Sequence, residues 1–485
     1  MEKYLYGASV QGIQSFIFQT SKLKEIVGAS ELVERICTDF FDEFAKNGES
    51  IVRAAGKVIF AFNDKKECEL AVKLFPRKVM TIAPGITISQ AVVKYSDDYV
   101  LASNELEAKL RIQRNKPARS LTMGLMSVSR APSTGLPAVK SQKGVLVDDA
   151  SVKKTDSTQT TKGLMMKLTD DAALKHDDIA YDFKDLEGHN SWIAVIHADG
   201  NGIGNIVQQV CKNSNDAKLF SNLLNNITIE SARDAYKKAI EKNKKRKIPV
   251  RPVVLGGDDL TIICRADLAI AFIQRYLEAF ESESKKQLKQ LGKYEIVSKG
   301  LTACAGIAFV KSSYPFHYAI NLAESLCVEA KKEAKKIDSD LAPSCFSFHK
   351  VQDSFVESYD VIALRELTPN LNLSFKCGPY YIHEQEVDGC ETASQLLSDI
   401  SRLESKEGNA LKSHLRQWLS LLFDDIGAAN QKMKRIRTVN KLALQVIPEC
   451  YEKISGDSQC KIPYYNILSL ASILLQRTKD GGNVE

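Results

Sequence analysis

Two adjacent carboxylates after a glycine pair are the residues of this chain best suited to chemistry. Gly256-Gly257-Asp258-Asp259 stand between the apolar runs 253–255 and 260–264, which predicts two strands joined by a tight turn. Like charges repel at such a tip, and a bound divalent cation removes that cost. Two Mg²⁺ ions held by carboxylates are typical of nucleotidyl transfer. The alternative is a solvated turn, since Gly and Asp are common turn residues.

A second motif favours the metal site over the solvated turn. The apolar run 192–198 is typical of a buried strand, and it ends in Asp199-Gly200-Asn201-Gly202-Ile203-Gly204. A carboxylate leaving a strand, followed by glycines that free backbone N–H groups, suits a metal-bound triphosphate. An EF-hand loop starting at Asp199 would place Ile203 at a ligand position, and no Walker A motif occurs.

With these motifs in one order, the sequence resembles the large polymerase-cyclase subunit of type III CRISPR effector complexes. Further parts of the resemblance, which covers residues 190–350, are the run 312–316, Ala323-Glu324 and Ala330-Lys331. It implies synthesis of cyclic oligoadenylates from ATP with two Mg²⁺ or Mn²⁺ ions. The implied catalytic residues are Asp199, Asp258 and Asp259, with the carbonyl of Gly200 as a further metal ligand. The implied nucleotide-binding residues are Asn201, Gly202, Gly256, Gly257, Ser313 and Lys331.

The N-terminal region reads as a degenerate copy of the same unit. An apolar strand, 4–10, is followed by Gln11-Gly12, where the second copy has Asp199-Gly200, and the segment 51–60 replaces the carboxylate hairpin. We therefore expect an α/β (α+β) fold with two ferredoxin-like palm domains, the first degenerate and the second catalytic, and a helical C-terminal domain. The expected division is a degenerate palm at 1–112, a linker or small insert at 113–190, the catalytic palm at 191–351 and the helical domain at 352–485.

Composition is consistent with a cytoplasmic protein of several domains. The 485 residues exceed what one core usually supports, and no apolar run approaches a membrane span. The 11 cysteines are scattered without a C-x-x-C pair, which indicates reduced thiols. Many members of the family carry a zinc knuckle near 127–138, but the cysteines are absent there, so we expect no zinc. We expect the polar run 153–162 to be a mobile surface loop.

Partners and competing functions follow from the resemblance. A DNA-cleaving HD domain is not expected, because the seven histidines are mostly isolated. The helical segments 411–423, 432–446 and 464–475 would form the C-terminal domain. Expected partners are ATP, other CRISPR effector subunits and crRNA or target RNA, with no membrane. Two alternatives stay open: a free-standing signalling cyclase of antiviral defence with the same palm, and a non-enzymatic RNA-binding scaffold.

Overall fold

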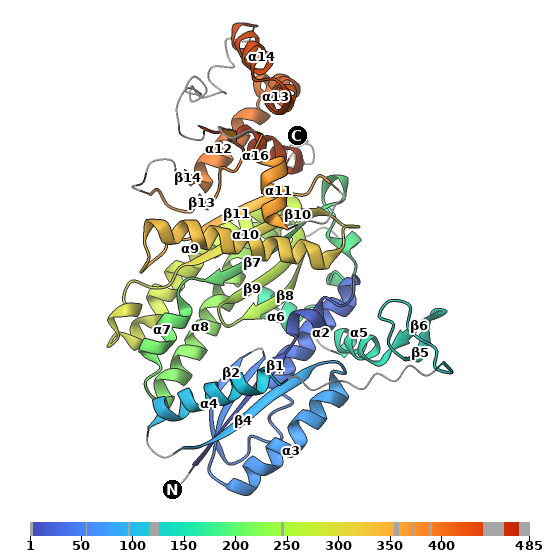
Figure 1. The fold of residues 1–485 in the computed structure, drawn as a ribbon, viewed down its shortest axis with the longest axis vertical. Coiled ribbons are helices and arrows are strands. Elements are labelled where there is room, and N and C mark those ends of the chain that lie inside the picture. The colour runs from blue at the N-terminus through green and yellow to red at the C-terminus, as the bar shows by residue number, and fades with distance from the viewer. Residues whose placement is uncertain are drawn as a thin grey trace.

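The computed structural model describes residues 3–54, 56–95, 98–116, 126–160, 162–243, 247–353, 358–369, 373–385, 387, 390–439 and 460–474. A four-stranded N-terminal sheet, a seven-stranded sheet and a group of C-terminal helices follow one another along the long axis of the molecule (Figure 1). Among the described residues, no helix combines the length and the apolar character that crossing a membrane would require.

The N-terminal sheet is antiparallel, with the strand order β2-β3-β1-β4. Alternation along β3 explains why both faces are covered: Val58, Phe60 and Phe62 join one core, whereas Ile59 and Ala61 join a separate cluster containing Leu106 of α4. The elements of this unit are β1 (Lys3–Gln11), α1 (Ile13–Ile17), α2 (Leu23–Cys37), β2 (Gly48–Ala54), β3 (Lys57–Phe62), α3 (Lys65–Ile82), β4 (Thr87–Tyr95) and α4 (Tyr99–Arg114).

The larger sheet has the order β14-β13-β11-β10-β7-β9-β8. Strand β7, which lies between β10 and β9, is antiparallel to both of these neighbours, and its predicted apolar run is almost wholly buried. Its elements are β7 (Trp192–Gly200), α7 (Ile203–Val210), α8 (Ser214–Ala235), the π-helix Tyr236–Ile240, β8 (Val250–Gly256), β9 (Asp259–Arg265), α9 (Ala269–Gln287), β10 (Ala303–Lys311), α10 (Phe316–Ile337), β11 (Cys345–Lys350), β13 (Tyr380–Tyr381) and β14 (Glu391–Thr392).

The two sheets share one topology, which confirms the predicted pair of palm folds. The order β8-β9-β7-β10 in the larger sheet repeats the order β2-β3-β1-β4 in the smaller one. The register corrects the predicted alignment of the copies. Ser9 pairs with Lys57 at the start of β3, as Asp199 pairs with Asp259 at the start of β9. Ser9, and not Gln11, therefore occupies the place of Asp199, because β1 continues two residues further before its glycine.

Helix α10 lies so close to β10 that only glycine fits at position 306. A Cβ there would lie 2.0 Å from the carbonyl oxygen of Ala323 and 2.5 Å from the amide nitrogen of Cys327. We expect Gly306→Ala to push α10 off the sheet and to lower the free energy of unfolding by about 1–3 kcal/mol. Urea denaturation measures this. Gly204→Ala is the matched control, because a Cβ at this helical position meets open space, and an equal loss there would contradict the packing argument.

The segment between the two palms is more ordered than its composition predicts. It contains β5 (Ala138–Gln142), β6 (Val145–Asp148), α5 (Asp149–Thr160) and α6 (Gly163–Thr169). The prediction of a mobile loop at 153–162 is wrong through Thr160, and residue 161 lies outside the described residues. Lys154 is 1% exposed and its Nζ donates to the carbonyl oxygen of Phe16 at 2.6 Å. This tertiary contact orders a polar helix that has no apolar periodicity of its own.

The C-terminal region is mainly helical, as predicted. Segment 411–423 lies in α13, and the described parts of 432–446 and 464–475 lie in α14 and α16; residues 440–446 and 475 lie outside the described residues. The elements are α11 (Tyr359–Glu366), β12 (Leu373–Ser374), α12 (Ala393–Glu404), α13 (Lys406–Asp424), α14 (Ile426–Val439), β15 (Cys460–Lys461) and α16 (Tyr464–Leu474).

Candidate metal and nucleotide site

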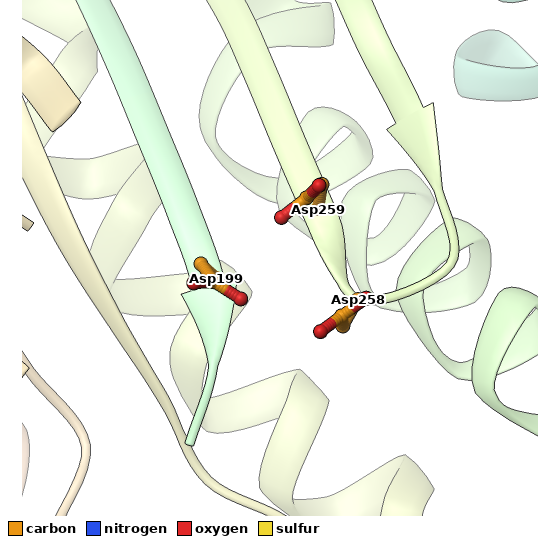
Figure 2. A group of neighbouring side chains, drawn as sticks. All are labelled: Asp199, Asp258 and Asp259. Carbon is orange, nitrogen blue, oxygen red and sulfur yellow. The ribbon is translucent and has the colours of Figure 1, made fainter. Parts of the chain in front are cut away.

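Three carboxylates meet where β7 ends and the β8–β9 hairpin turns. Asp199 and Asp259 are register partners on adjacent antiparallel strands, and Asp258 precedes Asp259 in the turn. One ligand oxygen from each carboxylate lies within 4.8 Å of the other two. Figure 2 shows the three side chains gathered between the two strands. Carboxylate oxygens at this spacing are the ligands that Mg²⁺ and Mn²⁺ prefer, so these residues fit the divalent cations expected from the sequence.

The turn that carries the aspartates is held by helix α8. Gly257 has φ +64°, a left-handed conformation that favours glycine. Its N–H donates to Oδ1 of Asn225 at 3.3 Å, and its carbonyl accepts from Oγ1 of Thr228 at 2.6 Å. The sequence analysis missed Asn225 and Thr228 as supports of the turn. The sequence signal that could have identified them is a pair of polar residues three positions apart, next to the apolar positions of the same helix.

Lys331 of α10 lies at the same end of the sheet. Its Nζ donates to Oδ2 of Asp199 at 2.5 Å and to the carbonyl oxygen of Gly200 at 2.9 Å. The packing of α10 on β10 and β7 places this ammonium group beside the carboxylates. Two of the residues expected at the site, Gly200 and Lys331, are therefore in contact with the aspartate cluster. One cation among three carboxylates leaves the cluster electronegative.

The excess negative charge helps to raise the pKa values of two of the three carboxyl groups, those of Asp258 and Asp259. Desolvation, followed by the charges of Asp258 and Asp199, raises the pKa of the Asp259 carboxyl group to about 7, although part of its side chain is exposed. Desolvation and Asp199 also raise the pKa of Asp258. Neighbouring carboxylates that resist ionisation are a feature of sites that function with a bound cation.

These pKa values predict a pH-dependent metal affinity. A cation must displace the proton of Asp259 when the pH is below about 7, so the affinity for Mn²⁺ should fall roughly tenfold per pH unit on further acidification. Isothermal titration with Mn²⁺ at pH 8, 7 and 6 measures this dependence. In Asp259→Asn the binding should be weaker and its dependence over this range shallower. An affinity of the wild type that is constant between pH 8 and 6 would contradict the assignment.

Two residues expected to bind the nucleotide do not face the cluster. The side-chain Nδ2 of Asn201 donates to Oγ1 of Thr302 at 3.0 Å and to the carbonyl oxygen of Ala342 at 3.2 Å, inside the fold. Ser313 lies beyond Lys311, which pairs with Trp192 at the opposite end of β7 from Asp199. Trp192 and Asp199 are seven residue steps apart along β7, about 23 Å. Ser313 therefore lies towards the other end of the sheet from the cluster, because β10 runs antiparallel to β7, and its contact with a nucleotide stays a prediction.

Two glycines and one contact of the N-terminal unit lie near the site. Gly202 is the N-cap residue of α7 and has φ +66°, and a Cβ at Gly202 or Gly257 would meet open space. Gln14 of the N-terminal unit donates to Oε1 of Glu324 at 2.6 Å, and the charge of Glu324 contributes to the raised pKa of Asp259. The N-terminal palm therefore contacts α10, the helix that also carries Lys331.

Comparisons with known proteins agree with this description. Residues 192–339 match the family model described as Cas10/Cmr2, second palm domain. The chain is similar to the structure of a Csm1-Csm4 cassette in complex with cA4 (TM-score 0.59, 14% identity, covering 98% of this chain and 70% of the other). It is also similar to the cassette with one ATP (TM-score 0.55, 13%, 98% and 70%) and to Csm1 in T.onnurineus (TM-score 0.55, 12%, 98% and 70%). At this identity the likeness concerns the fold. No curated protein matches the sequence.

Proposed function

Because this chain contains a second palm domain of the Cas10/Cmr2 family within a Csm1-like fold, we propose that it is a nucleotidyltransferase making cyclic oligoadenylates from ATP. We propose further that it acts as the large subunit of an RNA-guided type III CRISPR complex. The observation that carries the enzymatic proposal is the cluster of Asp199, Asp258 and Asp259, whose ligand atoms lie within 4.8 Å of one another.

In this proposal the three carboxylates would hold two Mg²⁺ or Mn²⁺ ions, with the carbonyl of Gly200 as a further ligand. When bound, such ions polarise an attacking ribose hydroxyl and stabilise the charge of a leaving pyrophosphate. Lys331, already beside Asp199, would pair with the triphosphate through its ammonium group. The turn residues Gly256 and Gly257 present no side chains, so the nucleotide can approach their backbone. Asn225 and Thr228 fix that turn and so position Asp258 and Asp259.

The partner proposals rest on the solved structures. The similar structures are described as a Csm1-Csm4 cassette in complex with cA4, with cA3 or with one ATP. By analogy, we propose that this chain binds ATP and another subunit of its own complex, with crRNA and target RNA as further partners. The approach of Gln14 to Glu324 supports a nucleotide pocket to which both palms contribute.

The test is a nucleotide panel. The purified chain is incubated with Mg²⁺ or Mn²⁺ and with ATP, GTP, CTP or UTP separately, and the products are identified by mass spectrometry. Cyclic oligoadenylates from ATP are the expected result. Purification of the tagged chain from its own cells, followed by analysis of the bound RNA and subunits, separates a complex subunit from a free-standing cyclase. Another nucleotide as the sole substrate would contradict the ATP proposal, and a chain isolated without RNA or subunits would contradict the complex.

A further inference from the structure

A groove lies at the end of β7 opposite the carboxylates, between the larger sheet and the C-terminal helices. It consists of two adjoining cavities of about 430 and 330 Å³ that share Lys350 and Gln352 as a common wall. The first is lined by residues at the N-terminal end of β7 and after β10, including Trp192, Ser313 and Tyr314. The second is lined by α13 and α16. Each cavity has the size of a small-ligand site.

Three cations converge on this groove. Nζ of Lys311 and Nζ of Lys350 lie 4.3 and 4.7 Å from the ring centroid of Trp192, so one indole ring orients both ammonium groups. Arg416 lines the second cavity. Burial, Lys311 and Arg416 lower the pKa of Lys350 to about 8, as expected where like charges are gathered without enough counter-charge. One carboxylate, Asp353, lines the first cavity and is already paired with Arg365 at 3.7 Å.

Aromatic side chains complete the walls and indicate the class of anion. Tyr314 lines the first cavity, and Phe423 and Tyr465 line the second, where both pack on the fully buried ring of Phe375. Phe423 is 44% exposed, a high value for a large apolar ring. A positive groove with aromatic walls is the arrangement by which proteins hold single-stranded nucleic acid, since the cations contact phosphates and the rings contact bases. An acidic peptide would use the cations and leave the rings without a role.

We propose that this groove binds single-stranded RNA through consecutive phosphates, with Lys311, Lys350 and Arg416 as the phosphate contacts. Its distance of about 23 Å from Asp199 along β7 makes it a site separate from the carboxylate cluster. Ser313 then lies beside an RNA strand, and the polar run 312–316 has a function other than holding the substrate nucleotide. Two cavities with a shared cationic wall offer room for more than one nucleotide.

The test is the salt dependence of RNA binding. A fluorescein-labelled ten-nucleotide uridine RNA is titrated with the full chain in EDTA, and fluorescence anisotropy is measured from 50 to 300 mM salt. Each phosphate contact contributes about 0.7 to the slope of log affinity against log salt for single strands. Lys311→Gln and Arg416→Gln should each weaken binding several-fold at low salt and reduce the slope by that amount. Lys289→Gln, an exposed lysine elsewhere on the larger palm, should change neither.

A second readout requires no substitution. Acetylation of lysines by an amine-reactive reagent, followed by peptide mass spectrometry, should label Lys311 in the chain alone and spare it when the RNA is present. Lys289 should be labelled equally in both conditions. Unchanged slopes in both variants, or labelling of Lys311 unaffected by saturating RNA, would overturn the proposal. Protection of Lys311 by decaglutamate and not by the RNA would also overturn it, in favour of an acidic peptide.

Discussion

The double variant Asp258→Asn/Asp259→Asn should lose cyclic oligonucleotide synthesis while keeping its fold. Asparagine has the shape of aspartate but no charge, so the proposed divalent cations would lose two of their three carboxylates. We expect a decrease in rate of at least roughly a thousandfold, or about 4 kcal/mol of transition-state stabilisation. Product formation from ATP, quantified by mass spectrometry, measures this effect.

Stability separates the loss of a site from the loss of the fold. The pKa values of Asp258 and Asp259 are raised in the folded chain, so their ionisation opposes folding. This destabilisation is fully present above pH 7 and is relieved as the pH falls towards the unfolded values. In EDTA at pH 8 the double variant should therefore have a Tm at or above that of the wild type. Asp340→Asn, an exposed aspartate outside the cluster, is the matched control and should leave both activity and Tm unchanged. A double variant with full activity would contradict the assignment.

The second large effect is expected at the contact between the two palms. Arg251 of β8 and Glu31 of α2 are 0% and 3% exposed, and Nη2 and Oε1 are 3.9 Å apart. Burial raises the pKa of Glu31 and lowers that of Arg251 to about 10, so each charge depends on its partner. Arg251→Met should lower the free energy of unfolding by about 3–5 kcal/mol, because it leaves a buried carboxylate without its counter-charge. Urea denaturation at pH 7 measures this loss.

Three comparisons isolate the buried pair. In Arg251→Met/Glu31→Leu no charge is left unpaired, so the double variant should recover much of the loss of Arg251→Met. The loss of unfolding free energy in Arg251→Met should also become smaller at lower pH, because protonation of Glu31 removes the unpaired charge. Asp170→Asn removes an exposed partner of Arg233 and should cost at most about 1 kcal/mol. Additive losses in the double variant would show that the pair is not coupled.

Local sequence patterns were sufficient for the strands and for the three aspartates. An apolar run followed by Asp199, and a glycine-containing turn before Asp259, specify where each strand ends. Antiparallel pairing then brings the two ends together. The gathering of Asp199, Asp258 and Asp259 could be predicted because each lies next to its own strand boundary. The domain boundaries and the role of these residues stay predictions.

Features that depend on register or on distant contacts could not be predicted. The end of the sheet at which Ser313 lies is set by the antiparallel pairing of β10 with β7. The equivalence of Ser9 with Asp199 appears only when the pairs of both sheets are compared. Helix α5 lacks an apolar stripe, and Lys154 is buried because it reaches Phe16, far away in sequence. The groove around Lys350 combines residues from β7, β11, α13 and α16.

The most direct test of nucleotidyl transfer is the ratio of pyrophosphate released to adenosine incorporated, measured for the chain with ATP and Mn²⁺ and with any RNA and subunits that co-purify. Each phosphodiester bond formed by attack on an α-phosphate releases one pyrophosphate, so a cyclic product made from n ATP molecules releases n pyrophosphates. The proposed function predicts a ratio of one and a product without a terminal triphosphate. Conversion of ATP to ADP and phosphate, with no oligonucleotide formed, would contradict it.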